Sequence, residues 1–271
     1  MAMKVLPLQP NDHRSIKKVA NELKTFERIN HPNLVRYYGI EIHNDEMLMF
    51  MEYCDEGTLE ALAASTEGLP EEIVRKYTRQ LLSAVQTMHE NGIVHRDIKG
   101  FVMPEPNIFL AKEGNVLKLG DFGCAVRIRG LQTEVNELSG IVGTHAYMAP
   151  EIFRSNEGHG RAADIWSVGC VVIEMLTGKR PWPQYDSSVQ IMFQVGCGKS
   201  PSFPENLSEE GEIFLRHCFV HSPKDRATAS SLLDHTFVKV EEEENMSLPL
   251  FSLNSVPQAK RSRLFSNDIK T

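Results

Sequence analysis

The sequence predicts a two-lobed α+β fold, in which a small and incomplete strand-rich lobe precedes a large, mostly helical lobe. Runs typical of short strands fill most of the first 53 residues, whereas later segments have helical periodicity. The segment 162–177 is almost entirely apolar, as expected of a helix buried at the centre of the larger lobe. We expect one domain over residues 1–240, with a partial first lobe (1–53) and a connecting hinge plus second lobe (54–240).

The first lobe is predicted to contain three strands and one helix. A strand is expected at 1–7, and apolar residues then recur at helical spacing between 16 and 26. A His-Pro-Asn sequence ends that helix. Two further strands, over 34–42 and 47–53, are joined by a polar turn.

The second lobe is predicted to begin with an amphipathic helix over 71–91, whose apolar residues lie on one face. Strands at 108–110 and 116–119 flank a polar turn and form a β-hairpin. The buried helix over 162–177 ends at Gly178, a residue suited to a helix C-cap. Later helices are expected to start near Ser187, Ser208 and Thr228.

Composition excludes several classes of protein. The net charge of −7 disfavours a nucleic-acid partner, because binding phosphate backbones requires a basic surface. The five cysteines are scattered without C-x-x-C spacing, which indicates neither a disulfide framework nor a zinc site. No apolar run approaches the ~20 residues of a membrane span. The first residues also lack the apolar core of a signal peptide, so we expect a cytoplasmic protein without membrane insertion.

Beyond residue 240 the periodic pattern is lost. Four consecutive glutamates are followed by scattered Ser, Pro and basic residues, which predicts a disordered tail over 241–271. The basic residues at 260–263 suit either a nuclear-import signal or, as we prefer, a solubilising patch.

Three motifs occur in a fixed order along the second lobe. His-Arg-Asp-Ile-Lys at 95–99 follows the amphipathic helix, Asp-Phe-Gly at 121–123 follows the hairpin, and Ala-Pro-Glu at 149–151 comes later. This order and context are typical of protein kinases, and the chain resembles a eukaryotic Ser/Thr kinase catalytic domain over about residues 2–240. The sequences around 50–59 and 158–167 are similar to those of the MAP kinase kinase kinases, and of their MEKK four branch in particular.

This resemblance implies a kinase fold and transfer of the ATP γ-phosphate to Ser or Thr of a protein substrate, a MAP kinase kinase, with Mg²⁺ as cofactor. Asp97 would orient the substrate hydroxyl and accept its proton. Lys99, at a spacing typical of Ser/Thr kinases, would stabilise the transferring phosphate. Asp121 would hold Mg²⁺. Without the accompanying motifs, Asp97 and Lys99 would be interpreted as an exposed ion pair.

The resemblance also implies a nucleotide site at the first lobe. Lys4 would grip the α and β phosphates, and Glu22 would pair with it. Glu22 lies on the flank of an apolar helical stripe, where a carboxylate requires a cation; the alternative is a solvated Glu with a surface Lys. Met51 would be the gatekeeper behind adenine, and the backbone from Glu52 to Cys54 the hinge.

Regulatory roles are implied for the segment after Asp121. Arg96 would be a buried cation that binds an activation-loop phosphate. Thr133 and Ser139 are the possible acceptors, and we favour Ser139 over Thr133, although an ordinary polar loop is an alternative. Thr144 is expected to brace the catalytic Asp and Lys rather than to accept phosphate.

Three further charged residues are predicted to be structural. Glu151 and Arg226 would form an ion pair. Asp164, in the apolar helix, must be hydrogen-bonded, and the backbone of the catalytic loop is its expected partner.

The chain departs from the family pattern at two places. Nothing upstream of Lys4 contains a glycine-rich phosphate loop, as expected of a truncated gene model, a fragment or a splice form. The metal-binding Asn, five residues after Asp97 in similar kinases, is here Asn107, ten residues on, so that 101–106 is interpreted as an insertion. Because loop closure costs little per added residue, the insertion can bulge. Two hypotheses follow: an active kinase, or an impaired kinase fragment that serves as a binding module.

Overall fold

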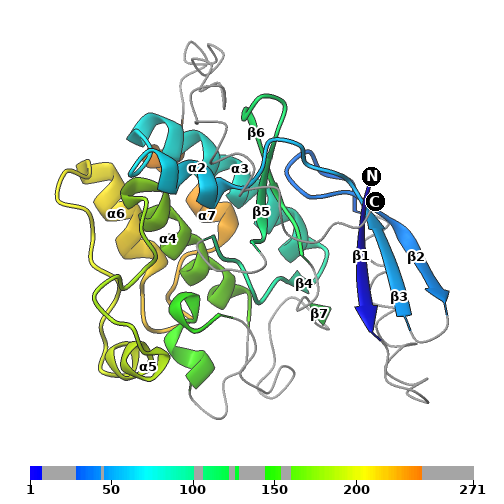
Figure 1. The fold of residues 1–271 in the computed structure, drawn as a ribbon. Helices are drawn as coiled ribbons and strands as arrows, with labels where there is room; N and C mark the ends of the chain where they lie inside the picture. Colours follow the sequence, from blue (N-terminus) through cyan, green and yellow to red (C-terminus); the bar gives the residue numbers. More distant parts are fainter. Residues whose placement is uncertain are drawn as a thin grey trace.

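The computed structural model describes residues 1–7, 29–43, 46–100, 106–121, 126–127, 144–153 and 160–239. Two unequal parts are visible in Figure 1, where a small sheet stands to one side of a larger body of helices. This arrangement agrees with the predicted two-lobed α+β fold. None of the described helices is long and apolar enough to cross a membrane.

The small lobe contains a three-stranded antiparallel sheet. Its strands are β1 (Ala2–Pro7), β2 (Tyr37–His43) and β3 (Glu46–Met51), and β3 lies in the middle. The three predicted strands are therefore confirmed. The chain preceding β2 leaves the sheet, however, because Val35 N donates to Leu119 O at 2.9 Å and Leu119 N to Asn33 O at 2.9 Å. The helix predicted over 16–26 lies outside the described residues.

The large lobe is built from helices and short strand pairs. Its helices are α2 (Leu59–Ser65), α3 (Glu71–Glu90), α4 (Arg161–Thr177), α5 (Ser188–Gly196), α6 (Glu209–Cys218) and α7 (Ala229–Leu233). Its strand pairs are β4 (Ile93–Val94) with β7 (Val126–Arg127), and β5 (Ile108–Ala111) with β6 (Val116–Leu119). Short 3₁₀ turns are η2 (His145–Tyr147), η3 (Pro150–Phe153) and η4 (Thr236–Val238).

The predicted helix boundaries agree closely with these elements. Ser187, Ser208 and Thr228 are the N-caps of α5, α6 and α7. Gly178 caps the end of α4 with a left-handed backbone, φ 64°, which glycine adopts without steric cost. The hydroxyls of Ser208 and Thr228 accept backbone N–H bonds that would otherwise lack partners.

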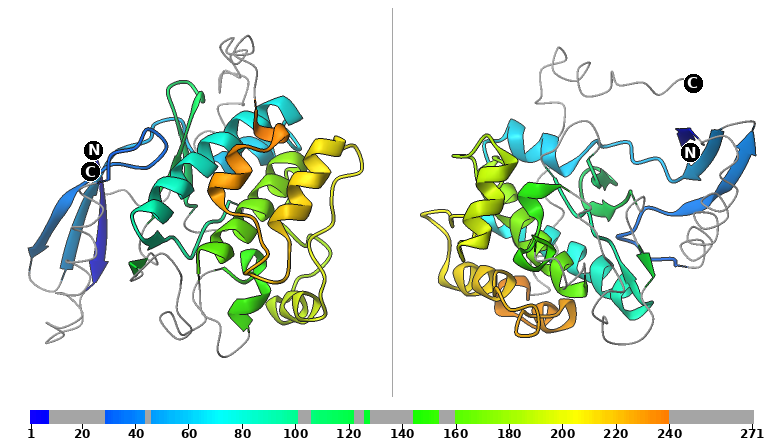
Figure 2. Two further views of the ribbon diagram at one scale, coloured as in Figure 1. Left: turned by 180° about the vertical axis from the view of Figure 1, so that it is seen from behind. Right: turned by 90° about the horizontal axis from the view of Figure 1, so that it is seen from below.

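Helix α4 lies at the centre of the core. Trp166 on α4 is fully buried, as are Phe214 on α6 and Phe237 on η4, and α3 packs against α4 and α7. The two views in Figure 2 show α4 enclosed by the other helices. Burying each large side chain contributes about 1.5–3 kcal/mol to stability. Most of the core cluster among the described residues lies in the large lobe, and it also includes apolar side chains of β2 and β3.

The predicted Glu151–Arg226 ion pair is present and lies in this core. Arg226 Nη1 and Nη2 donate to Glu151 Oε1 and Oε2 at 2.7 and 2.8 Å, and both side chains are almost completely buried. The guanidinium also stacks over Trp166 at 5.2 Å. The pair connects η3 to the segment preceding α7.

Candidate active site

Asp164 on α4 fixes the backbone of the loop that contains Asp97. It is buried, and its two carboxylate oxygens accept the backbone N–H groups of His95 and Arg96 at 2.9 Å each. His89 Nε2 lies 2.8 Å from the same carboxylate. Burial alone would raise the pKa of Asp164, but the hydrogen bond and charge of His89, the charge of His95 and the backbone N–H of Arg96 together outweigh it and lower that pKa. The expected bonding of Asp164 to this loop is confirmed.

Arg96 has φ 72°, a left-handed backbone that is uncommon for a residue with a side chain. The carboxylate of Asp164 accepts the Arg96 N–H, and this bond favours the unusual conformation. The strained backbone immediately precedes Asp97.

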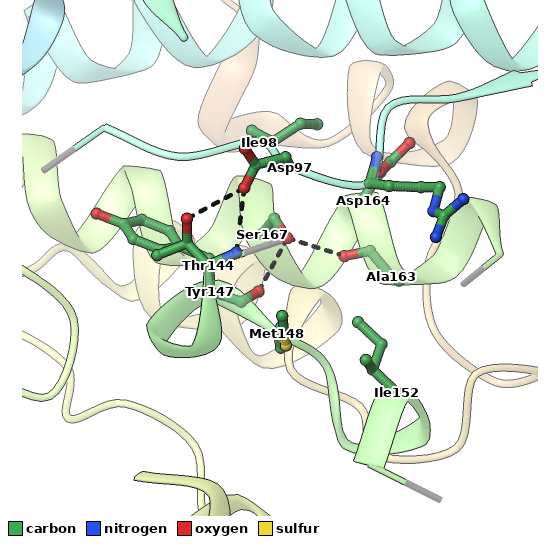
Figure 3. A pocket seen from close by; sticks show the side chains of 10 residues that line it. Asp97, Ile98, Thr144, Tyr147, Met148, Ile152, Ala163, Asp164 and Ser167 are labelled. Carbon is green, nitrogen blue, oxygen red and sulfur yellow. Dashed lines mark hydrogen bonds between the residues drawn. The ribbon is translucent and has the colours of Figure 1, made fainter. Parts of the chain in front are cut away.

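Asp97 lies at the centre of a hydrogen-bonded cluster. Lys99 Nζ is 2.8 Å from Asp97 Oδ2, and both side chains are mostly buried. Thr144 donates its backbone N–H and its hydroxyl to Asp97 Oδ1, each at 3.1 Å (Figure 3). The predicted bracing by Thr144 is therefore present for Asp97.

Asn107 reaches this cluster in spite of its ten-residue separation from Asp97. It is completely buried, and its Nδ2 donates to the backbone oxygen of Asp97 and, at 3.3 Å, to its carboxylate. Its own backbone oxygen accepts from Gly120 N at 2.8 Å, which fixes the start of β5. The structure thus brings Asn107 into hydrogen-bond contact with Asp97. Residues 101–105 of the predicted insertion lie outside the described residues.

Asp121 follows β6 with a left-handed backbone, φ 55°. Its carboxylate oxygens lie 3.2 and 3.3 Å from Lys4 Nζ, and both side chains are partly exposed. Lys4 extends from β1, so this contact bridges the two lobes. Glu22, the predicted partner of Lys4, lies outside the described residues, and that pairing stays a prediction.

Asn107 and Asp121 fit a magnesium ion. Asn107 Oδ1 is buried and has no hydrogen-bond partner within the described part of the chain. A buried acceptor without a partner is unfavourable, so it points to a ligand such as a cation. Amide and carboxylate oxygens are the ligand type that Mg²⁺ prefers. Lys4, which contacts Asp121, supplies a positive charge suited to phosphate.

The connection between the lobes begins at Met51, which ends β3 and packs against the core. The Glu52 carboxylate pairs with Lys118 Nζ at 2.9 Å. Burial, reinforced by the negative charge of Glu52, raises the pKa of the Cys54 thiol to about 11. The sequence analysis did not identify Lys118 as a site residue. A lysine between two leucines of a predicted hairpin strand could have indicated a cation that requires a carboxylate partner.

A small cavity lies between the Asp97 loop, the η2–η3 region and α4 (Figure 3). Ser167 on α4 donates to Tyr147 O at 2.9 Å, and this bond fixes η2 against α4 next to Asp97.

The possible phosphate acceptors Thr133 and Ser139 lie outside the described residues. The predicted contact of Arg96 with a phosphate therefore stays a prediction.

The chain matches the family model described as "Protein kinase domain" over residues 1–238. It is 58% identical over 243 residues to "Mitogen-activated protein kinase kinase kinase 4" of Mus musculus and of Homo sapiens. It is 40% identical over 239 residues to "Mitogen-activated protein kinase kinase kinase ANP1" of Arabidopsis thaliana. These alignments cover 88–89% of this chain, but only 15% of the mouse and human relatives and 35% of the plant protein.

Proposed function

The chain belongs to the protein kinase domain family, and on that premise we propose that it transfers the ATP γ-phosphate to Ser or Thr of a protein substrate. The observation that carries the proposal is the cluster of Lys99, Thr144 and Asn107 around Asp97, each within hydrogen-bond or ion-pair distance of it. The ten-residue separation between Asp97 and Asn107 therefore does not prevent their contact.

In the proposed mechanism the substrate hydroxyl oxygen bonds to the γ-phosphorus while the bond from that phosphorus to the β-γ bridging oxygen breaks. ADP leaves, and the hydroxyl proton passes to Asp97. Lys99 stabilises charge on the transferring group. Bound Mg²⁺ supplies charge neutralisation on the phosphates, and Asn107 and Asp121 are the residues that would hold it.

Nucleotide binding is assigned to the small lobe and the connection. Lys4, aided by Glu22, would hold the α and β phosphates. Met51 would close the back of the adenine site, and the backbone of Glu52 and Cys54 would bond to the adenine edge. The partly exposed contact of Lys4 with Asp121 supports this assignment, because Lys4 lies next to the carboxylate that we propose as a metal ligand.

We further propose that the substrate is a MAP kinase kinase, that the reaction is cytoplasmic, and that phosphorylation of Ser139 provides the anion for Arg96. Support for the substrate comes from the 58% identity to relatives named mitogen-activated protein kinase kinase kinase 4.

The test is phosphorylation of a purified, unphosphorylated MAP kinase kinase by the 271-residue chain with Mg-ATP. We expect Asp97→Asn to lower the rate about a thousandfold, because the proton acceptor is lost while the shape is kept. The control is Asp234→Asn, which alters an exposed carboxylate at the end of α7 and should leave the rate unchanged. A folded wild-type chain without phosphorylation activity would favour the binding-module hypothesis instead.

A further inference from the structure

One oxygen of the Glu52 carboxylate joins three segments of the chain. Glu52 Oε2 lies 2.9 Å from Lys118 Nζ on β6 and accepts the backbone N–H of Arg36 at 3.0 Å. Glu52 N donates in return to Arg36 O at 2.8 Å. The connection between the lobes, the segment before β2 and the hairpin β5–β6 therefore meet at this carboxylate.

Both side chains of the Glu52–Lys118 pair are largely shielded from water, and such burial is unusual for a lysine. The Lys118 side chain is 10% exposed and that of Glu52 27%. Lysine is almost never buried without a partner, and Glu52 is the only carboxylate within ion-pair distance of Lys118 among the described residues. Separating the two would leave a cation in a medium of low dielectric, where its charge is poorly compensated.

Each partner belongs to an element that positions a residue of the proposed nucleotide site. Lys118 lies in the hairpin whose two ends carry Asn107 and Asp121. Glu52 directly follows β3, in which Met49 is the register partner of Lys4 on β1. The pair thus links the elements that carry the proposed metal ligands to the sheet that carries the proposed phosphate-binding lysine.

Among the described residues, two ion pairs link the small sheet and the chain that follows it to the hairpin β5–β6 and its flanking residues. Lys4 contacts Asp121 at 3.2 Å, and Glu52 contacts Lys118 at 2.9 Å where the chain passes between the lobes. The first contact requires the sheet and the hairpin to be close enough for Lys4 to reach Asp121. The second is present in the same structure, which means that the two contacts are compatible and can reinforce each other.

We propose that Glu52 and Lys118 are positioning residues that fix the small sheet relative to the hairpin β5–β6, at the angle where Lys4 and Asp121 can contact one nucleotide together. Neither side chain touches the reacting phosphate in this scheme. The consequence for nucleotide binding rests on the proposed kinase function, whereas the effect on the connection between the lobes does not.

The experiment uses the 271-residue chain and four variants: Lys118→Met, Glu52→Gln, their combination, and Lys118→Arg. Calorimetry measures the Kd of Mg-ATP, and steady-state kinetics separates kcat from the KM for ATP. Hydrogen exchange of peptides covering the connection is measured without nucleotide. Glu41→Gln is the matched control, because it removes a carboxylate of the same sheet that pairs with an exposed histidine.

Either single charge-removing variant should raise the Kd and KM for ATP roughly tenfold, leave kcat within about twofold, and speed exchange in the connection. The double variant should be no worse than either single one, because both disrupt one shared interaction. Lys118→Arg, which keeps the charge, should restore most of the affinity, and Glu41→Gln should match the wild type.

Unchanged exchange and affinity in both single variants would overturn the proposal, as would strictly additive effects in the double variant. A wild-type chain that binds no Mg-ATP would instead refute the proposed function. The nucleotide-free exchange data would still decide whether the pair restrains the connection.

Discussion

The Arg226–Glu151 pair inside the large lobe and the Lys4–Asp121 pair between the lobes show how differently two regions of the molecule are held together. The side chains of the first pair are 0% and 2% exposed, whereas those of the second are 31% and 20% exposed. The Arg226–Glu151 pair is enclosed by the core of the large lobe, which is formed without a bound substrate. The second faces water at a place where a nucleotide would lie.

This difference separates residues that preserve the fold from residues that act on a ligand. Breaking a buried pair leaves one charge without water or partner, and the folded state becomes much less stable. A partly exposed pair gains little from its Coulomb attraction because water and salt screen it. Stability should therefore depend on the large-lobe pair, and activity on the pair between the lobes.

The largest stability effect is expected for Arg226→Met. The substitution keeps most of the side-chain length but leaves Glu151 buried without its cation, which should cost about 3–5 kcal/mol of unfolding free energy. Urea denaturation measures the loss. Arg216→Met is the control, since Arg216 pairs with Glu212 at an exposed position, and its cost should stay below about 1 kcal/mol. Similar losses for both variants would contradict the distinction drawn from burial.

The buried contacts of the large lobe were also the contacts that the sequence could predict. Asp164 lies in an apolar helix, and a buried carboxylate must be hydrogen-bonded, so its bonding to the nearby catalytic loop followed from a general rule. The helix starts near Ser187, Ser208 and Thr228 were predicted as well, and Ser and Thr are favoured N-cap residues. The side chains of Ser208 and Thr228 make the cap bond, whereas that of Ser187 does not.

Contacts across the lobes could not be predicted in this manner. Lys118 and Glu52 are 66 residues apart, and no local rule identifies which of many carboxylates meets a given lysine. The approach of Lys4 to Asp121 depends on how the lobes sit together, a property of the whole fold. Asn107 is intermediate. The low cost of loop closure indicated that the insertion before it could bulge, but the unpartnered Oδ1 of Asn107 is visible only in three dimensions.

The interlobe pair is tested by Lys4→Met. We expect kcat/KM for ATP to fall about a hundredfold, because a cation that stabilises phosphate charge is lost. The unfolding free energy should change by less than about 1 kcal/mol, since the Lys4 side chain is partly exposed. Kinetics and urea denaturation on the same preparation give both values. A large loss of stability with unchanged kinetics would reverse the assignment of this pair to ligand binding.

The smallest effect is expected at Glu71, whose side chain is 23% exposed, about as much as those of Lys4 and Asp121. Arg75 and the backbone and hydroxyl of Ser208 donate to its carboxylate, with the hydroxyl at 2.6 Å, which joins α3 to the start of α6. Burial alone would raise the pKa of Glu71, but the hydrogen bonds from Ser208 and Arg75, together with the charge of Arg75, outweigh it and lower that pKa. Glu71→Gln should cost about 1 kcal/mol of stability at pH 7.

The sign of the pH dependence follows from this lowered pKa. The stabilisation is complete above the pKa of Glu in the unfolded chain, about 4.3, and is lost as the pH falls through the lower folded-state pKa. The stability difference between wild type and Glu71→Gln should thus be the same at pH 7 and pH 5.5 and should narrow below about pH 4. Urea denaturation at these pH values measures it, and Glu72→Gln, at an exposed position of the same helix turn, is the control. A difference that widened on acidification would mean that the carboxylate is stabilised in its protonated form, and the hydrogen bonds from Ser208 and Arg75 could not then be what holds α3 to α6.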